Sequence, residues 1–232
     1  MNSTPAAPAE KPAVTVPPVV TAPVRERPVP AVKPAETGGK TEAGEGPEGF
    51  VNTMIGAQIG SYQVPSAPFK EIYGADATGT IGLSLSRTLI QYGALSFDVE
   101  GGIRFYSKTG ASTPDLEATT FKMTPISLAG RLNYQWKYFQ VFAGYGFDWY
   151  SYSETSTLTP EPTTGNATGH HFTAGIYLIP PVLDGMLRVK AYYKSTKVTA
   201  IKPWVSIDLG GNEVGVGLSL GFNLFKKGVL SF

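Results

Sequence analysis

Acidic and basic side chains alternate with apolar ones in GALSFDVEGGIRFYSKTG, residues 93–110. Asp98, Glu100 and Arg104 occupy even positions, whereas leucine, phenylalanine, valine and isoleucine occupy odd positions of the same segment. Successive side chains of a β-strand point to opposite faces, so these three charged groups share one face. Carboxylates and a guanidinium group enclosed together can form ion pairs, and this is the chemistry that the spacing predicts.

The two histidines, His170 and His171, are neighbours, and the chain contains no cysteine. Adjacent residues of a regular strand point to opposite faces, so the two imidazoles cannot bind one metal ion together. His171 with Asp148 or Ser151 could imitate a catalytic pair, provided that the side chains come into hydrogen-bonding contact. We instead interpret the histidines as polar residues at a strand end, and expect no enzyme, metal site or cofactor.

Composition divides the chain into two regions. Residues 1–49 contain 10 of the 19 prolines and no aromatic residue, a composition that cannot bury enough surface to fold. We predict a disordered Pro-rich linker over residues 1–49 and a folded domain over residues 50–232. The linker is either a passive spacer or a segment that contacts another envelope layer. The net charge of +1 gives no reason to expect a nucleic-acid partner.

Alternation of apolar and polar residues begins after residue 50 and recurs in eight runs of about ten residues. No apolar run approaches the length of about 20 residues that a membrane helix needs. The predicted strands cover residues 51–60, 75–86, 93–110, 126–136, 140–150, 170–178, 187–194 and 213–225.

The polar faces of these runs carry five acidic and five basic residues, whereas the apolar faces carry no charged residue. The predicted lumen charges are Asp76, Asp98, Glu100, Arg104, Arg131, Asp148, Arg188, Lys190, Lys194 and Glu213. Balanced charge favours an enclosed network, structural or pore-lining, because unpaired buried charges are costly. The same faces are rich in glycine, which leaves room for long side chains in a narrow barrel. A soluble lipocalin-like barrel, with the apolar faces inward, would have to expose these charges.

Aromatic residues lie near the ends of the runs, as in the interfacial girdles of membrane barrels. The predicted girdle comprises Tyr73, Tyr92, Phe105, Trp136, Tyr138, Trp149, Tyr150 and Phe222. Connections alternate between short and long, which predicts short turns on the periplasmic side and places both termini in the periplasm. Within residues 121–125, FKMTP, the phase does not match the strand that follows, so Pro125 marks a bulge or a strand start.

Three segments resemble strands of the small eight-stranded outer-membrane barrels of the OmpA, OmpX and OmpW kind. They are TPISLAGRLNY at 124–134, YFQVFAGYGFDWY at 138–150 and EVGVGLSLGFNLF at 213–225. The resemblance covers residues 50–225. Alternation and resemblance together predict an all-β fold: an eight-stranded antiparallel up-and-down transmembrane β-barrel with a disordered Pro-rich N-terminal tail.

The expected location is the outer membrane of a Gram-negative-type bacterium. The expected role is a structural anchor or interaction component of the cell envelope with a filled polar lumen. The alternative is a narrow porin-like channel for small solutes or ions. Expected partners are outer-membrane lipid and lipopolysaccharide, with a periplasmic protein or peptidoglycan reached through residues 1–49.

Overall fold

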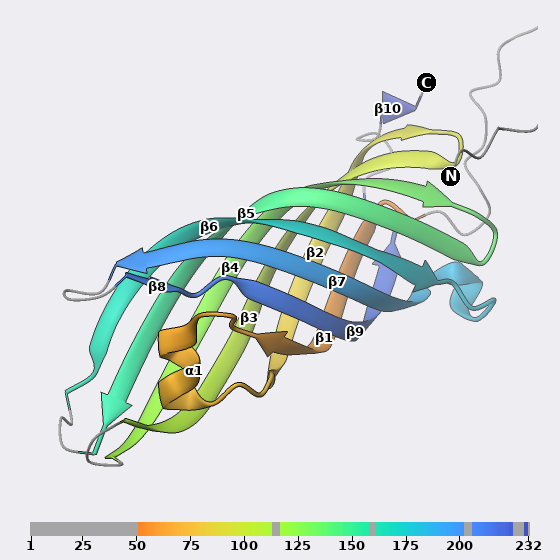
Figure 1. The fold of residues 1–232 in the computed structure, drawn as a ribbon. Coiled ribbons are helices and arrows are strands. Elements are labelled where there is room, and N and C mark those ends of the chain that lie inside the picture. Colours follow the sequence, from red (N-terminus) through yellow and green to blue (C-terminus); the bar gives the residue numbers. More distant parts are fainter. Residues whose placement is uncertain (1–50, 113–116, 158–160, 202–205, 225–229, 232) are drawn as a thin grey trace, which may run out of the picture. The chain divides into compact units, whose positions relative to one another are not determined.

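Eight long strands follow one another around a closed ring in the computed structural model (Figure 1), which describes residues 51–112, 117–157, 161–201, 206–224 and 230–231. They are β1 (Thr53–Gln63), β2 (Thr78–Tyr92), β3 (Leu95–Ser112), β4 (Glu117–Gln135), β5 (Phe139–Ser156), β6 (Thr163–Leu178), β7 (Leu187–Ile201) and β9 (Gly211–Phe222). Each pairs antiparallel with its neighbours, and β1 closes the ring by pairing with both β2 and β9. The eight-stranded antiparallel barrel is therefore confirmed, whereas the expected tail lies outside the described residues.

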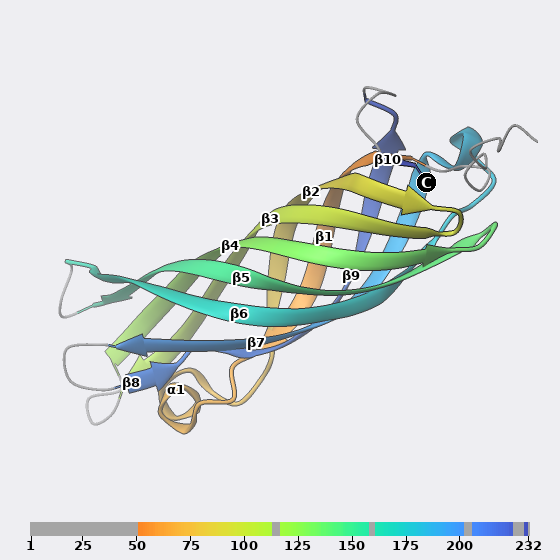
Figure 2. The same ribbon diagram turned by 90° about the horizontal axis from the view of Figure 1, so that it is seen from above.

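Four short elements accompany the eight barrel strands in the described residues. Strand β8 (Ser206–Asp208) pairs with the end of β7, and β10 (Leu230–Ser231) lies parallel to the end of β2. Helix α1 (Ala67–Tyr73) follows β1, and a single helical turn (Leu183–Gly185) lies between β6 and β7. Neither helix in the described residues is long enough to cross a bilayer. Figure 2 shows β1 to β7 and β9 as the wall of one barrel.

Most strands are longer than the sequence pattern predicted. Strand β4 begins at Glu117 rather than at residue 126, so only residues 113–116 separate it from β3. The connection over 179–186, expected to be short, is longer than the connection over 113–116, expected to be long. The predicted alternation of loop lengths is therefore wrong here, because strand pairing continues beyond the part of the wall that has an apolar outer face.

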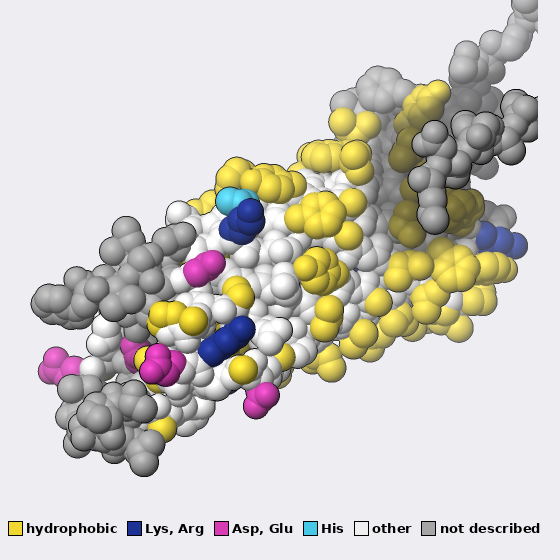
Figure 3. Space-filling view, in the orientation of Figure 1, with side chains coloured by type: hydrophobic (Ala, Val, Ile, Leu, Met, Phe, Trp, Pro, Cys, Tyr) yellow, Lys and Arg dark blue, Asp and Glu magenta, His cyan; other side chains and the backbone are white. Residues whose placement is uncertain are grey.

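The wall changes polarity along its length. Over the half near the turn at 93–94, apolar side chains such as Leu83, Leu128 and Leu218 are exposed on the outside. At the other end the interior is apolar: Tyr106, Phe121 and ten further residues form a buried cluster. Figure 3 shows hydrophobic side chains over one half of the visible face and mostly polar ones towards the end with α1 and β8. This pattern matches lipid around one half and water around the other.

This inversion explains the phase problem in FKMTP. Phe121, Met123 and Pro125 point inward on the same side of β4 as Ser127 and Arg131, so the strand has no bulge or break there. Only the polarity of the inward residues changes, from apolar near Phe121 to charged at Arg131. The prediction that Pro125 marks a bulge or a strand start is therefore wrong.

The end of the barrel with the polar outer face is called the aqueous end below. Helix α1 contributes the buried Phe69 and Tyr73 to the apolar cluster at this end. The Tyr73 ring centroid lies 5.8 Å from that of Phe121, and the Tyr73 hydroxyl donates to Glu154 Oε1. Burial, followed by the bond to Glu154, raises the pKa of Tyr73 above its ordinary value. The phenol, which is protonated at neutral pH as in any ordinary tyrosine, remains a donor at still higher pH and attaches α1 to β5.

The two-solvent wall predicts a position-dependent cost for a lysine on the outer face. Leu218→Lys, in the middle of β9, should lower the free energy of unfolding by about 2–4 kcal/mol, because the ammonium group would enter hydrocarbon. Thr164→Lys, exposed on the outer face of the aqueous end, should change it by less than about 0.5 kcal/mol. Urea unfolding of barrels folded into phospholipid vesicles measures both. Equal costs would contradict lipid contact around Leu218.

Candidate functional site: the charged lumen

Arg131 of β4 is the centre of the first lumen cluster and is fully buried. Its guanidinium group donates to Glu100 Oε2 at 2.5 Å, to Asp98 Oδ2 at 3.3 Å and to the Tyr177 hydroxyl at 3.1 Å. Lys190 of β7 donates to both Glu100 oxygens, at 3.1 and 3.2 Å. One cluster therefore joins β3, β4, β6 and β7 across the lumen, and each charge has an opposite charge beside it.

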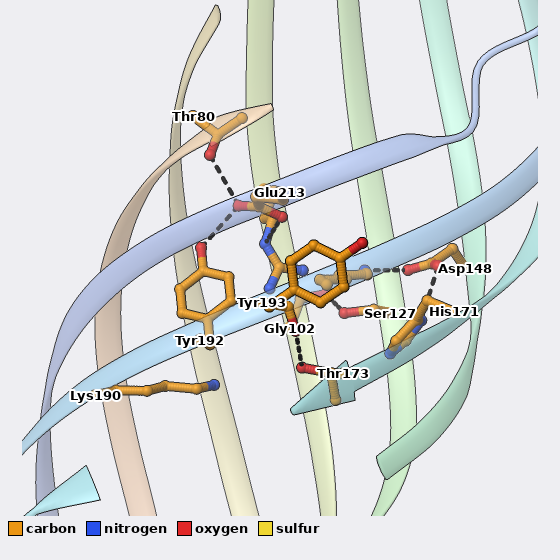
Figure 4. Close-up of polar contacts among 12 residues, drawn as sticks. Thr80, Gly102, Ser127, Asp148, His171, Thr173, Lys190, Tyr192, Tyr193 and Glu213 are labelled. Carbon is orange, nitrogen blue, oxygen red and sulfur yellow. Dashed lines mark hydrogen bonds and ion pairs between the residues drawn. The ribbon is translucent and has the colours of Figure 1, made fainter. Parts of the chain in front are cut away.

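Glu213 of β9 forms the second cluster with groups from three other strands. Arg104 Nε lies 3.1 Å from Glu213 Oε2, while Tyr192 and Thr80 donate to Oε1 at 2.7 and 2.9 Å (Figure 4). A Cβ atom on Gly60 would lie 2.7 Å from that oxygen, so a larger residue at this position would displace the Glu213 carboxylate.

Asp148 of β5 forms the third cluster, in which it is fully buried. Lys194 Nζ donates to Asp148 Oδ1 at 2.7 Å, and His171 Nδ1 lies 2.8 Å from Oδ2 (Figure 4). Asp148 and His171 thus make the contact considered from the sequence. Ser151 is exposed, on the opposite face of β5, so it does not complete a Ser–His–Asp arrangement. The described residues contain no group of three or more metal-binding side chains.

Arg188 of β7 is buried near the turn end of the lumen. Its guanidinium group donates to the Gln140 side-chain oxygen and, at 3.4 Å, to that of Gln135. The amide oxygens of two neighbouring strands thus hold this cation.

Side chains fill the space between the clusters. A cavity of about 10 Å³ lies among residues that include Arg104, Tyr150, Lys194 and Glu213. This volume is about what one water molecule requires. The charged groups therefore occupy the lumen rather than line a continuous opening at this level.

Nine of the ten predicted lumen charges lie inside the barrel: Asp98, Glu100, Arg104, Arg131, Asp148, Arg188, Lys190, Lys194 and Glu213. Asp76 does not, and its prediction is wrong. It is exposed in the connection between α1 and β2, because β2 begins only at Thr78. The expected balance of five against five thus becomes four carboxylates against five Lys and Arg among these nine residues.

Phe142, an aromatic residue inside the lumen, was not singled out from the sequence. The Phe142 ring lies 5.1 Å from the Arg131 guanidinium carbon and 5.2 Å from Lys190 Nζ, and Tyr192 lies 5.1 Å from the same ammonium group. These contacts are cation–π interactions, which stabilise desolvated cations. Phe142 has the parity of Gly144 and Asp148, so its position in the alternation was the available signal.

Five predicted girdle residues are exposed, and two of them, Trp136 and Tyr138, lie in the turn between β4 and β5: Tyr92, Phe105, Trp136, Tyr138 and Trp149. Phe222 is half-buried. The predictions for Tyr73 and Tyr150 are wrong, since both residues are buried in the apolar cluster. Tyr73 belongs to α1 rather than to a strand end, and Tyr150 has the inward parity of Asp148. The role of the outer aromatics as a girdle stays a prediction.

Removing the central cation tests the network. Arg131→Ala should lower the free energy of unfolding by about 3–5 kcal/mol, because it removes the ion-pair partner of Asp98 and leaves Glu100 with one fewer partner. The matched variant Arg87→Ala, at a half-exposed position, should cost less than about 1 kcal/mol. Urea unfolding and the heat-dependent gel shift of the folded barrel provide the measurements. Similar costs for the two variants would refute a structural role for the Arg131 network.

Comparison with known proteins supports the same architecture. No protein-family model and no curated protein sequence matches the chain. Neisserial surface protein A is 14% identical, with a TM-score of 0.52 over 77% of this chain and 100% of that chain. The outer membrane protein OprG from Pseudomonas aeruginosa is 12% identical, with a TM-score of 0.51 over 76% and 98% of the two chains. The chain therefore has the fold of the small eight-stranded outer-membrane β-barrels.

Proposed function

We propose that the chain is an outer-membrane protein of a Gram-negative-type bacterium that acts as an envelope anchor or interaction component. The exposed apolar residues on all sides of one half of the wall support a location within a bilayer. The filled lumen is the observation that favours an anchor over a channel, because the cavity near Arg104 has room for about one water molecule. The Asp148–His171 pair, separated from Ser151 by the barrel wall, supports a non-enzymatic role.

The proposed orientation has both termini in the periplasm. Strand β1 begins and β9 ends beside the same end of the wall, where Thr53 is paired with Phe222. The turns at 93–94 and 136–138 lie at this end too. The opposite end, with its apolar interior and polar outer face, would then stand in water at the cell surface. Residues 1–49 would enter the periplasm and reach a periplasmic protein or peptidoglycan.

The alternative function is a narrow channel for small solutes or ions. Buried charges and polar groups along the lumen, from Arg188 to Glu213, favour it because they could solvate a permeating ion. Conduction would require Arg131 or Arg104 to leave its carboxylate partners. The close pairing of these groups therefore opposes the channel.

Planar bilayer recordings distinguish the anchor from the channel. The purified full-length chain should give no reproducible openings above those of a protein-free detergent blank, since side chains fill the lumen. Openings whose frequency rises with protein concentration, and whose ion selectivity changes in Lys190→Glu, would contradict the anchor and establish the channel.

Removal of residues 1–49 tests the role of the N-terminal region. The shortened chain should still insert and show the heat-dependent gel shift, but should lose most of its co-sedimentation with purified peptidoglycan sacculi. A chain with a Gly/Ser segment of equal length is the control for spacing. Equal co-sedimentation of all three chains would contradict the contact through residues 1–49.

A further inference from the structure

A groove of about 610 Å³ crosses the outer face of β4, β5 and β6. Two rows of paired residues line it. Ile126, Trp149 and Thr168 form one row across the three strands, and Thr124, Ser151 and Asn166 form the next. The first row contains exposed apolar side chains and the second is polar. The groove therefore lies where the outer face changes from apolar to polar.

The groove combines an aromatic surface with uncharged polar groups. The Trp149 side chain is 48% exposed there. Within the described part of the chain, the hydroxyls of Ser151 and Thr168 and the amide of Asn166 make no side-chain hydrogen bond to protein. No Lys, Arg, Asp or Glu lines the groove. The site thus offers hydrogen-bond donors and acceptors beside an indole ring but no charge for a phosphate.

The strand pairing changes beside this groove. Strand β6 pairs with β7 only from Gly169 onwards, whereas residues 163–168 pair with β5 alone. Figures 1 and 2 both show β6 and β7 separating at this end. None of the residues that line the groove belongs to β7, so β4, β5 and β6 form it by themselves.

We propose that this groove binds a sugar. A pyranose ring has a face of C–H groups that packs against an aromatic ring, and peripheral hydroxyls that exchange hydrogen bonds with Ser, Thr and Asn. A pocket of this size, mainly apolar with a few convergent polar groups, is typical of small-ligand sites. The sugar comes either from a membrane glycolipid, whose headgroup would lie at this depth, or from a free oligosaccharide. Only the glycolipid source rests on the proposed outer-membrane location.

Calorimetric titration of the full-length chain in detergent tests the groove. The probes are the soluble core oligosaccharide released from lipopolysaccharide, intact deep-rough lipopolysaccharide and phosphatidylglycerol. Trp149→Ala and Asn166→Ala should each weaken oligosaccharide binding by about tenfold or more, the effect of losing one favourable contact. Trp136→Ala, at an exposed tryptophan near the opposite end of the wall, should leave binding unchanged. The heat-dependent gel shift checks that each variant is folded.

The outcomes separate the possibilities. Trp149-dependent binding of the oligosaccharide supports the proposal, and competition by lipopolysaccharide assigns the glycolipid as a source. Three results would overturn it: no oligosaccharide binding, equal affinities in the Trp149 and Trp136 variants, or equal displacement by phosphatidylglycerol. Membrane fractionation tests the location separately, because a chain absent from the outer membrane could still bind the oligosaccharide in detergent.

Discussion

The pairing of Arg131 with Glu100 and Asp98 is the interaction on which the barrel interior depends. A guanidinium group with no exposed surface is tolerable only if opposite charges and hydrogen bonds replace its water. These partners come from β3, Tyr177 from β6 and Lys190 from β7, so the cluster constrains the register of four strands. Gly144 opposite Arg131 is part of the same constraint, since a Cβ there would lie 2.6 Å from Arg131 Cγ.

Two solvents act along the same strands and explain the rest of the fold. Where the outer face is apolar, polar and charged groups must be enclosed, and they require partners from across the lumen. Where the outer face is polar, the strands bury Phe121 and Tyr152 as a soluble protein would. Helix α1 adds Phe69 and Tyr73 to this second core, so the aqueous end of the described barrel is packed with aromatic side chains.

Because side chains fill the interior, the outer surface of the barrel is the better candidate for ligand binding. Transport through the lumen would have to disrupt three charged clusters and the apolar core above them. The groove beside Trp149, in contrast, lies on the outer face, and the side chains of Ser151, Asn166 and Thr168 make no hydrogen bond within the part of the chain that the structure describes. Its position at the change from apolar to polar wall allows a ligand to contact both the indole ring and Asn166.

The sequence alone determined which residues of a strand share a face, because the period of two is local: within a strand, Asp98, Glu100 and Arg104 lie on one face however the strands are arranged. It also determined the number of strands, and it could have placed Tyr150 and Phe142 inside by parity. Only the tertiary structure decided which charges meet, since Arg104 pairs with Glu213, distant in sequence, through strand register. Asp76 lies outside the lumen because α1 precedes β2, which begins only at Thr78. The groove likewise depends on the register of β4, β5 and β6, which places Ile126, Trp149 and Thr168 side by side and leaves no periodic signal in any one strand.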